Sequence, residues 1–206
     1  MRAVLFDVDG VLIHSFFHPD PARRRRWDQH LHDDLGVRRE ALEPFFGDGF
    51  VDIVEGRMSI IAALDEFLPT IGFQGSSLDF FDYWLTHDVH LNLQLLDVVR
   101  RLRGTGARPF IATNQEHIRA FHLWSAVGLK HYFEDMFYAS RFGAGKQRPE
   151  FYERAEALIG PHDESPLFFD DSAKVVATAR AHGWEGVLYR DLADCTGHPW
   201  VAARLS

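Results

Sequence analysis

The sequence contains very little cysteine, since Cys195 is the only one among its 206 residues. One cysteine excludes an intramolecular disulfide, and the polar segment around it carries no pattern of a reactive thiol. Long apolar runs are also missing, because no stretch approaches the ~20 residues of a membrane-spanning helix. The chain starts with a strand-like stretch rather than a signal-peptide pattern. We therefore expect a cytoplasmic protein that has no membrane partner.

Positive charge is scarce relative to negative charge. The chain has 22 Lys and Arg against 30 Asp and Glu, which gives a formal net charge of -8 at pH 7. A general nucleic-acid-binding surface needs the opposite balance, so we expect no nucleic-acid partner. An anionic substrate would instead need local positive charge from a cation, a lysine or arginine side chain, or backbone N–H groups.

Short apolar stretches without alternation predict the buried strands of a parallel sheet, because a helical pattern follows each of them. Strands that alternate with helices in this way predict an α/β fold, a Rossmann-like parallel sheet flanked by helices. The predicted strands are Ala3–Phe6, Pro109–Ala112, Leu167–Phe169 and Gly186–Tyr189, with a weaker candidate at Met136–Ala139. The predicted helices are Leu95–Arg103, Glu116–Val127, Glu150–Ile159 and Ala173–His182.

One interval is too long to be a simple connection. From His14 to about Val89, roughly 75 residues separate the first strand from the next core helix. We predict an inserted all-helical subdomain over residues 14–90, called the helical insert below, and a core domain over 1–13 and 91–206. Its junctions would lie at the carboxyl ends of the strands, where open α/β folds bind ligands. The predicted helices of the insert are Arg23–Leu35, Glu40–Phe46, Ile60–Leu68 and Leu78–His87, with Ser59 and Ser77 as N-caps.

Four consecutive arginines, Arg23 to Arg26, begin the first predicted helix of the insert. Helical residues are rotated by about 100° from one to the next, so the four cannot share a face. We expect a solvated helix with salt bridges; the alternative is that one arginine faces the site and attracts an anionic ligand. Six aromatic residues are expected to form the core of the insert rather than a substrate pocket. They are Phe16, Phe17, Trp27, Phe45, Phe46 and Trp84.

Two pairs of aspartates follow predicted strands directly. Asp7 and Asp9 come after the first strand, and Asp170 and Asp171 come after a later one. Taken alone, the first pair is equally consistent with a turn, because Gly10 follows Asp9. Together, however, the pairs place four carboxylates at one edge of the sheet, where their repulsion requires a compensating cation or proton. A hard, oxygen-preferring cation such as Mg²⁺ would neutralise them. The alternative interpretation is that Asp170 or Asp171 only caps the next helix.

Residues suited to phosphate binding occur at matching positions. Thr113 and Asn114 end the second predicted strand and precede a helix, where a hydroxyl, an amide and free N–H groups together form an anion site. A simple helix cap is the alternative interpretation of this pair. Lys146 lies in a glycine-rich loop before another helix, where it would balance both the carboxylates and a phosphate.

Taken in order, Asp7 to Gly10, Thr113 with Asn114, Lys146, and Asp170 with Asp171 resemble the four motifs of the haloacid dehalogenase-like (HAD) hydrolase superfamily. The helical insert is similar to the C1-type cap of that superfamily. The segments around Lys146 and Asp170 resemble its sugar-phosphatase branch. The chain departs from the pattern because Gln147 and Arg148 separate Lys146 from the next proline.

The resemblance implies roles for these residues. Asp7 would attack phosphorus and form an aspartyl-phosphate that water then cleaves. Asp9 would protonate the leaving oxygen and later activate the water. Thr113 and Lys146 would hold the phosphoryl oxygens during catalysis, with Asn114 also in the phosphate site. The implied Mg²⁺ ligands are Asp7, Asp9 through its carbonyl, Asp170 and Asp171, with Asp171 the better direct ligand.

The function implied is a Mg²⁺-dependent phosphatase that acts on a small phosphorylated metabolite, a sugar phosphate being favoured. Asp9 favours phosphate chemistry over carbon–halogen cleavage, since only an ester oxygen needs protonation. A phosphomutase of the same fold is the nearest alternative. A signalling receiver domain is less favoured, because it needs only about 120 residues and has no helical insert, and an inert binding module is disfavoured because no motif charge is missing.

Overall fold

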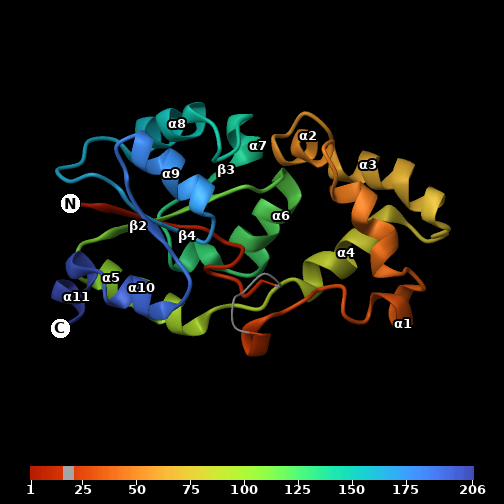
Figure 1. The fold of residues 1–206 in the computed structure, drawn as a ribbon, viewed down its shortest axis with the longest axis horizontal. Coiled ribbons are helices and arrows are strands. Elements are labelled where there is room, and N and C mark those ends of the chain that lie inside the picture. Colours follow the sequence, from red (N-terminus) through yellow and green to blue (C-terminus); the bar gives the residue numbers. More distant parts are fainter. Residues whose placement is uncertain (16–20) are drawn as a thin grey trace.

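The protein is described by a computed structural model that covers residues 1–15 and 21–206 (Figure 1). Its centre is a five-stranded parallel sheet in the order β3-β2-β1-β4-β5. The strands are β1 (Ala3–Phe6), β2 (Arg108–Thr113), β3 (Met136–Tyr138), β4 (Leu167–Asp170) and β5 (Glu185–Leu188). All five predicted strands are confirmed, including the weaker candidate, and so is the parallel α/β sheet. The order places β1 between β2 and β4, so the carboxyl ends that carry the predicted site residues are neighbours.

Helices cover both faces of the sheet (Figure 1). Because alternate side chains of a strand point to opposite faces, Val4 and Phe6 of β1 pack into one buried cluster while Ala3 and Leu5 pack into another. The first cluster is completed by α5 (Leu93–Gly104), α6 (His117–Phe121), α10 (Leu192–Thr196) and α11 (Pro199–Leu205). The second is completed by α7 (Ala139–Phe142), α8 (Pro149–Ile159) and α9 (Ala173–Ala181).

The helical insert lies beside the carboxyl ends of the strands, at the right of Figure 1. Its side chains form a third apolar cluster of their own, which includes Leu64, Phe80 and Trp84. The elements are α1 (Leu31–Leu35), α2 (Phe50–Val54), α3 (Ile60–Phe67) and α4 (Ser77–His87), with 3-10 helices at Pro21–Arg23, Arg39–Phe46 and Leu68–Ile71. Among residues 1–15 and 21–206, no helix has the length and apolarity needed to cross a membrane.

The start of the insert differs from the prediction. The predicted helix Arg23–Leu35 is wrong, since only Leu31–Leu35 is α-helical. Arg26 instead binds Asp28 through two side-chain hydrogen bonds of 2.7 Å. Side chains two residues apart do not face each other on an α-helix, so this ion pair favours a non-helical backbone. The segment predicted as helix Glu40–Phe46 is a 3-10 helix, and Pro44 inside it lacks the N–H that an α-helix would use.

The two predicted helix caps have different outcomes. Ser59 is confirmed as the N-cap of α3. The N-cap of α4 is Ser76 rather than Ser77, because the Ser76 hydroxyl accepts hydrogen bonds from two backbone N–H groups of the first turn. Ser77 lies one residue further on, and its hydroxyl donates to Asp65.

Most of the described aromatic residues of the insert pack as expected. Phe45 and Trp84 are buried in its cluster, and Trp27 stacks on Trp84 with 5.0 Å between ring centroids. Phe46 is 42% exposed, however, and both Trp27 and Phe46 line a cavity beside Asp9. Trp27 and Trp84 therefore pack in the core of the insert, as expected, while each also borders a cavity, and the exposed Phe46 departs from the expectation. Phe16 and Phe17 lie outside the described residues.

The chain enters and leaves the insert at one place. Ile13 pairs with Leu91 in an isolated antiparallel bridge. Backbone hydrogen bonds on either side join His14 N to His90 O at 2.9 Å and Asn92 N to Leu12 O at 2.8 Å. These contacts hold the insert next to the strand ends.

Candidate active site

Three buried charges meet at the carboxyl end of the sheet. Asp7 directly follows β1, Asp170 ends β4, and Lys146 lies in the loop between α7 and α8. The Lys146 ammonium is 2.7 Å from Asp7 Oδ1 and 2.7 Å from Asp170 Oδ2. All three residues are at most 6% exposed, so the two carboxylates share one cation out of contact with bulk water.

Two hydrogen bonds to the backbone of Lys146 fix the position of this residue in its loop. The Lys146 N–H donates to Asn114 Oδ1 at 2.8 Å, and the Tyr152 hydroxyl of α8 donates to the Lys146 carbonyl at 2.7 Å. Burial alone would lower the pKa of Lys146, but the charges of Asp170 and Asp7 outweigh it and hold that pKa above its usual value. The ammonium group therefore stays charged where a phosphate would bind.

The carboxylates still carry more negative charge than Lys146 balances. Burial raises the pKa of Asp7 to about 8; Lys146 opposes this rise, while Asp170, Asp171 and Asp9 add to it. Ligand oxygens of Asp7, Asp170 and Asp171 all lie within 4.8 Å of one another. An all-oxygen set at this spacing, with uncompensated charge, fits a hard divalent cation such as Mg²⁺.

The two members of the second aspartate pair have different surroundings. Asp170 Oδ1 accepts a hydrogen bond from the Ser172 N–H at 2.8 Å, and its Oδ2 contacts Lys146. Each oxygen of Asp170 thus has a protein partner. Asp171 is exposed toward the cavity, which favours it as the direct metal ligand.

Gly10 allows the loop that follows β1 to lie close to Asp171. Its φ is +84°, a conformation that other residues rarely adopt. A Cβ at this position would lie 2.0 Å from Asp171 Oδ2. The glycine is therefore required by a close contact as well as by the turn that the sequence indicates.

Thr113 and Asn114 occupy the end of β2, as expected. Both line a cavity of about 260 Å³ together with Asp7, Asp9 and Lys146, so the structure brings all the predicted site residues to one place. The helix predicted at Glu116–Val127 is confirmed over most of its length, as α6 (His117–Phe121) followed directly by a π-helical turn over His122–Ala126. The first N–H groups of α6 are taken by the Glu116 side chain. The predicted anion site at this helix start is therefore occupied by Glu116, and the Asn114 amide holds the Lys146 loop.

The Asp9 carboxylate has two side-chain partners, Arg119 and Gln115, that are not evident from the sequence. Arg119 of α6 binds both carboxylate oxygens, with Nη1 3.0 Å from Oδ2 and Nη2 2.8 Å from Oδ1. Gln115 Nε2 donates to Oδ2 at 2.6 Å. Burial raises the pKa of Asp9, but Arg119 and Gln115 outweigh it and hold that pKa below its usual range. In the sequence, the excess of four carboxylates over one lysine indicates a further cation at the site. It does not distinguish a bound metal ion from a buried arginine such as Arg119.

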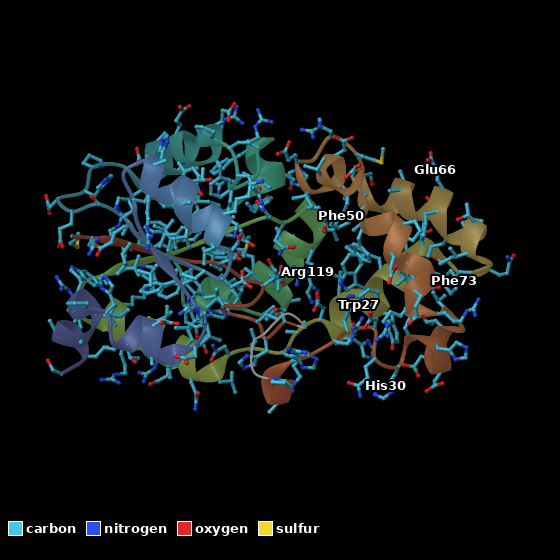
Figure 2. All side chains as sticks on the ribbon, in the orientation of Figure 1. Trp27, His30, Phe50, Glu66, Phe73 and Arg119 are labelled. Carbon is cyan, nitrogen blue, oxygen red and sulfur yellow. The ribbon has the colours of Figure 1, made fainter. Side chains whose placement is uncertain are left out.

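A larger cavity of about 700 Å³ lies between the strand ends and the insert. Asp9 borders this cavity and also the smaller one that contains Asp7, Thr113 and Lys146. Arg119 lies between the sheet and the helices of the insert, with Trp27 on the side of the insert (Figure 2). The smaller cavity suits a phosphoryl group, and the larger one suits the organic part of a substrate.

A family model described as haloacid dehalogenase-like hydrolase matches residues 1–183. The chain belongs to this family. The match confirms the resemblance carried by the four motifs and identifies the chain as a HAD-like hydrolase. None of the curated proteins that were compared matches it.

Solved structures show the same fold. A HAD family enzyme of Bacteroides thetaiotaomicron in a magnesium complex is 20% identical, with a TM-score of 0.72 and 98% of each chain covered. The same enzyme with magnesium and inorganic phosphate is 18% identical, with a TM-score of 0.69 and coverage of 90% of this chain and 92% of that one. A predicted HAD-like hydrolase of Porphyromonas gingivalis is 23% identical, with a TM-score of 0.70 and coverage of 98% and 95%. At these identities the comparison shows the shared fold.

Proposed function

We propose that the protein is a Mg²⁺-dependent phosphatase that hydrolyses a small phosphorylated metabolite through an aspartyl-phosphate. The observation that supports it most directly is the buried group of Asp7, Lys146 and Asp170, with Asp171 at its open side. Membership of a hydrolase family is consistent with this chemistry. The magnesium and phosphate bound by the Bacteroides enzyme of the same fold support the choice of cofactor and substrate class.

The proposed reaction has two steps. In the first, a carboxylate oxygen of Asp7 bonds to phosphorus, the ester P–O bond breaks, and Asp9, once it carries a proton and is released from Arg119, gives that proton to the leaving oxygen. In the second, Asp9 takes a proton from water, the water oxygen bonds to phosphorus, and the bond to Asp7 breaks. Inorganic phosphate leaves, and Asp9 is again protonated.

The other residues supply charge and position. Thr113 and Lys146 hold the phosphoryl oxygens, and Asn114 holds the loop that carries Lys146. Mg²⁺, held by Asp7, Asp171 and the carbonyl of Asp9, with Asp170 beside them, would neutralise charge on the phosphoryl group when bound.

We also propose that residues 14–90 act as a C1-type cap on a core formed by 1–13 and 91–206. The separate apolar cluster of the insert and the paired chain crossings at Ile13 and Leu91 support this division. The cavity that the insert shares with Asp9 would then hold the organic part of the substrate. Sugar phosphates are the first candidates, on the resemblance of the motifs.

The function is tested with a panel of phosphorylated metabolites that includes glucose 1-phosphate, assayed with Mg²⁺ and with EDTA. We expect inorganic phosphate from at least one member with Mg²⁺ and none with EDTA. Formation of an isomeric phosphosugar without phosphate release would show a phosphomutase instead. Stable phosphorylation of the protein without turnover would show a phospho-acceptor.

The nucleophile is tested in the same assay with Asp7→Asn. We expect turnover to fall by at least about 10⁴-fold, because the attacking carboxylate is lost, while the melting temperature stays within a few degrees of wild type. Asp97→Asn makes the same change at an exposed residue that pairs with Arg100 and should not affect turnover. Normal turnover by Asp7→Asn would overturn the assignment.

A further inference from the structure

Glu55, which directly follows α2 of the helical insert, binds the loop that carries Lys146. Its Oε1 accepts a hydrogen bond from the Gly145 N–H at 2.9 Å, and its Oε2 pairs with Arg148 at 3.5 Å and with Arg57. Glu55 is only 6% exposed and Gly145 is buried, so this hydrogen bond is shielded from water. The insert therefore holds the residue that directly precedes Lys146.

Close packing between the insert and the core sets the position of Glu55. The α2 helix lies beside α7 (Figure 1). A Cβ on the residue after Glu55, Gly56, would lie 3.0 Å from the Cβ of Ser140 in α7. The turn between α2 and α3 thus lies directly against the core, and the reach of the Glu55 carboxylate to Gly145 follows from this docking.

The next peptide group of the loop is held from the sheet. Asn114, which follows β2, accepts a hydrogen bond from the Lys146 N–H at 2.8 Å and donates one to Gln147 Oε1 at 3.2 Å. The peptide groups on the two sides of the Gly145 Cα are therefore fixed separately, one by the insert and one by the sheet. Because a glycine has the widest backbone freedom, the direction in which the chain enters Lys146 depends on both hydrogen bonds.

This direction matters for the donors of the Lys146 side chain. An ammonium group has three N–H donors on a flexible four-carbon stem. In the part of the chain that the structure describes, Asp7 and Asp170 lie 2.7 Å from the nitrogen and take two of these donors, which leaves the third for a phosphoryl oxygen. The third donor points to a fixed place only if the backbone at the base of the stem is fixed as well.

We propose that Glu55 is a positioning residue that holds the Lys146 loop through the Gly145 N–H, so that the phosphate site is complete only when the helical insert is docked on the core. The inference rests on the proposed phosphatase function, in which Lys146 holds the phosphoryl group. Glu55 acts through the loop and does not touch the substrate. Its effect therefore falls on the phosphoryl group, which all substrates share, and not on their organic parts.

Phosphate binding separates this role from a merely structural one. The probe is inorganic phosphate, whose Kd is measured by titration calorimetry with the Mg²⁺-loaded protein. For Glu55→Ala we expect this Kd to rise about 10-fold, because Lys146 is no longer held in place. The value of kcat/KM should fall by a similar factor for p-nitrophenyl phosphate and for every other ester that the wild type hydrolyses. An unchanged phosphate Kd, or a loss of kcat/KM confined to particular esters, would overturn the proposal.

Two further substitutions distinguish the reach of Glu55 from its charge. Glu55→Asp keeps the charge that pairs with Arg57 and Arg148 but is one methylene shorter, whereas Glu55→Gln keeps the reach and an accepting oxygen but loses the charge. Glu55→Asp should raise the phosphate Kd about as much as Glu55→Ala, and Glu55→Gln should restore it to within about 2-fold of wild type. The reverse order would overturn the proposal. If Glu55→Ala does not fold, this pair decides, and equal Kd values for the two variants overturn the proposal.

Controls separate this inference from the proposed function. Glu150→Gln removes an exposed carboxylate from the same Arg148 and should leave the phosphate Kd unchanged. Wild-type protein that releases no phosphate from any ester would defeat the phosphatase proposal, while the phosphate Kd of the Glu55 variants would still test the positioning role. Asp7-dependent hydrolysis and phosphate binding that Glu55→Ala leaves unchanged would defeat only the positioning role.

Discussion

The sheet and the helical insert are stabilised in different ways. The central strands β1 and β4 are buried between layers of helices, and strand residues such as Leu5, Phe137 and Phe168 are fully buried. The insert has one apolar cluster enclosed by short helices, of which the longest, α4, has 11 residues, and by 3-10 segments. We therefore expect a site built on the sheet to be held more rigidly than the groups that the insert contributes.

The sheet and the insert also contribute different chemical groups to the site. The charged groups that would handle a phosphoryl group, Asp7, Lys146 and Asp170, all come from the sheet and its loops. The insert reaches the site through polar contacts at its edge, from Asp88 to Arg119 and from Glu55 to the Lys146 loop. The sheet and its loops thus supply the charged groups, and the insert contacts the residues around them from one side.

The largest expected effect tests whether the two regions unfold separately. Phe137→Ala removes a ring that stacks with Phe110 in the sheet, and Phe80→Ala removes a ring that contacts Trp27 and Phe73 in the insert. Each should cost about 3–5 kcal/mol within its own cluster. Hydrogen exchange should show faster exchange throughout the chain for Phe137→Ala, but only in the insert for Phe80→Ala. Equal loosening of both regions by both variants would show that the molecule unfolds as one unit.

The next effect compares two glycines with nearly the same backbone conformation. Gly10, with φ +84°, touches Asp171 in the site, while Gly72, with φ +83°, has nothing within 4 Å of the position of a Cβ. Both alanine variants carry the same backbone strain, but only Gly10→Ala displaces Asp171, the proposed metal ligand. We expect Gly10→Ala to lower kcat by about 10²-fold and Gly72→Ala to leave it unchanged. Steady-state kinetics at saturating Mg²⁺ measures kcat for both variants. Equal kcat values would show that the close contact between Gly10 and Asp171 is not needed for activity.

The smallest expected effect concerns a contact between the regions. Glu55 accepts a hydrogen bond from the Gly145 N–H at 2.9 Å and is paired with Arg57 and Arg148. Burial raises the pKa of Glu55, but these partners outweigh burial and lower it from its ordinary value of 4.5. Ionised Glu55 therefore stabilises the folded protein above pH 4.5, and this contribution is lost as the pH falls through its lowered pKa.

Glu55→Gln should lower the melting temperature by about 2–4 °C at pH 7, because Arg57 and Arg148 are half exposed and the pairing is modest. The gap to wild type should close as the pH falls below about 4.5. Glu150→Gln, which removes an exposed carboxylate from the same Arg148, should not shift the melting temperature measurably. A gap that persists in acid would show that the charge of Glu55 is not what matters.

Prediction from sequence worked well where burial is continuous. The strand predicted at Leu167–Phe169 is observed at Leu167–Asp170, and the helix predicted at Leu95–Arg103 is observed at Leu93–Gly104. Continuous apolar runs and helical periodicity carry this information directly. In the insert, the composition of Arg23 to Leu35 predicts one helix. The ion pair between Arg26 and Asp28, which residues two apart on a helix could not form, is not visible in a hydrophobic periodicity.

The site could be predicted in part for a similar reason. Parallel strands bring their carboxyl ends together, so Asp7, Thr113 and Asp170 could be placed at one edge from their positions after apolar stretches. Arg119 could not be found in this way. It lies 110 residues from Asp9 in the chain, within a helix that reads as amphipathic, and its second partner comes from the insert. Only the three-dimensional placement of the insert reveals this contact.

The paired chain crossings at Ile13 and Leu91 have a consequence for how such a protein diversifies. Because the chain departs and returns at hydrogen-bonded neighbours, the sheet is complete whatever number of residues lies between them. Closing a loop of twice the length costs only about 0.6 kcal/mol more. Lengthening, shortening or exchanging the intervening segment therefore leaves the sheet and the residues at its strand ends in place, and related chains can diverge chiefly between these two points.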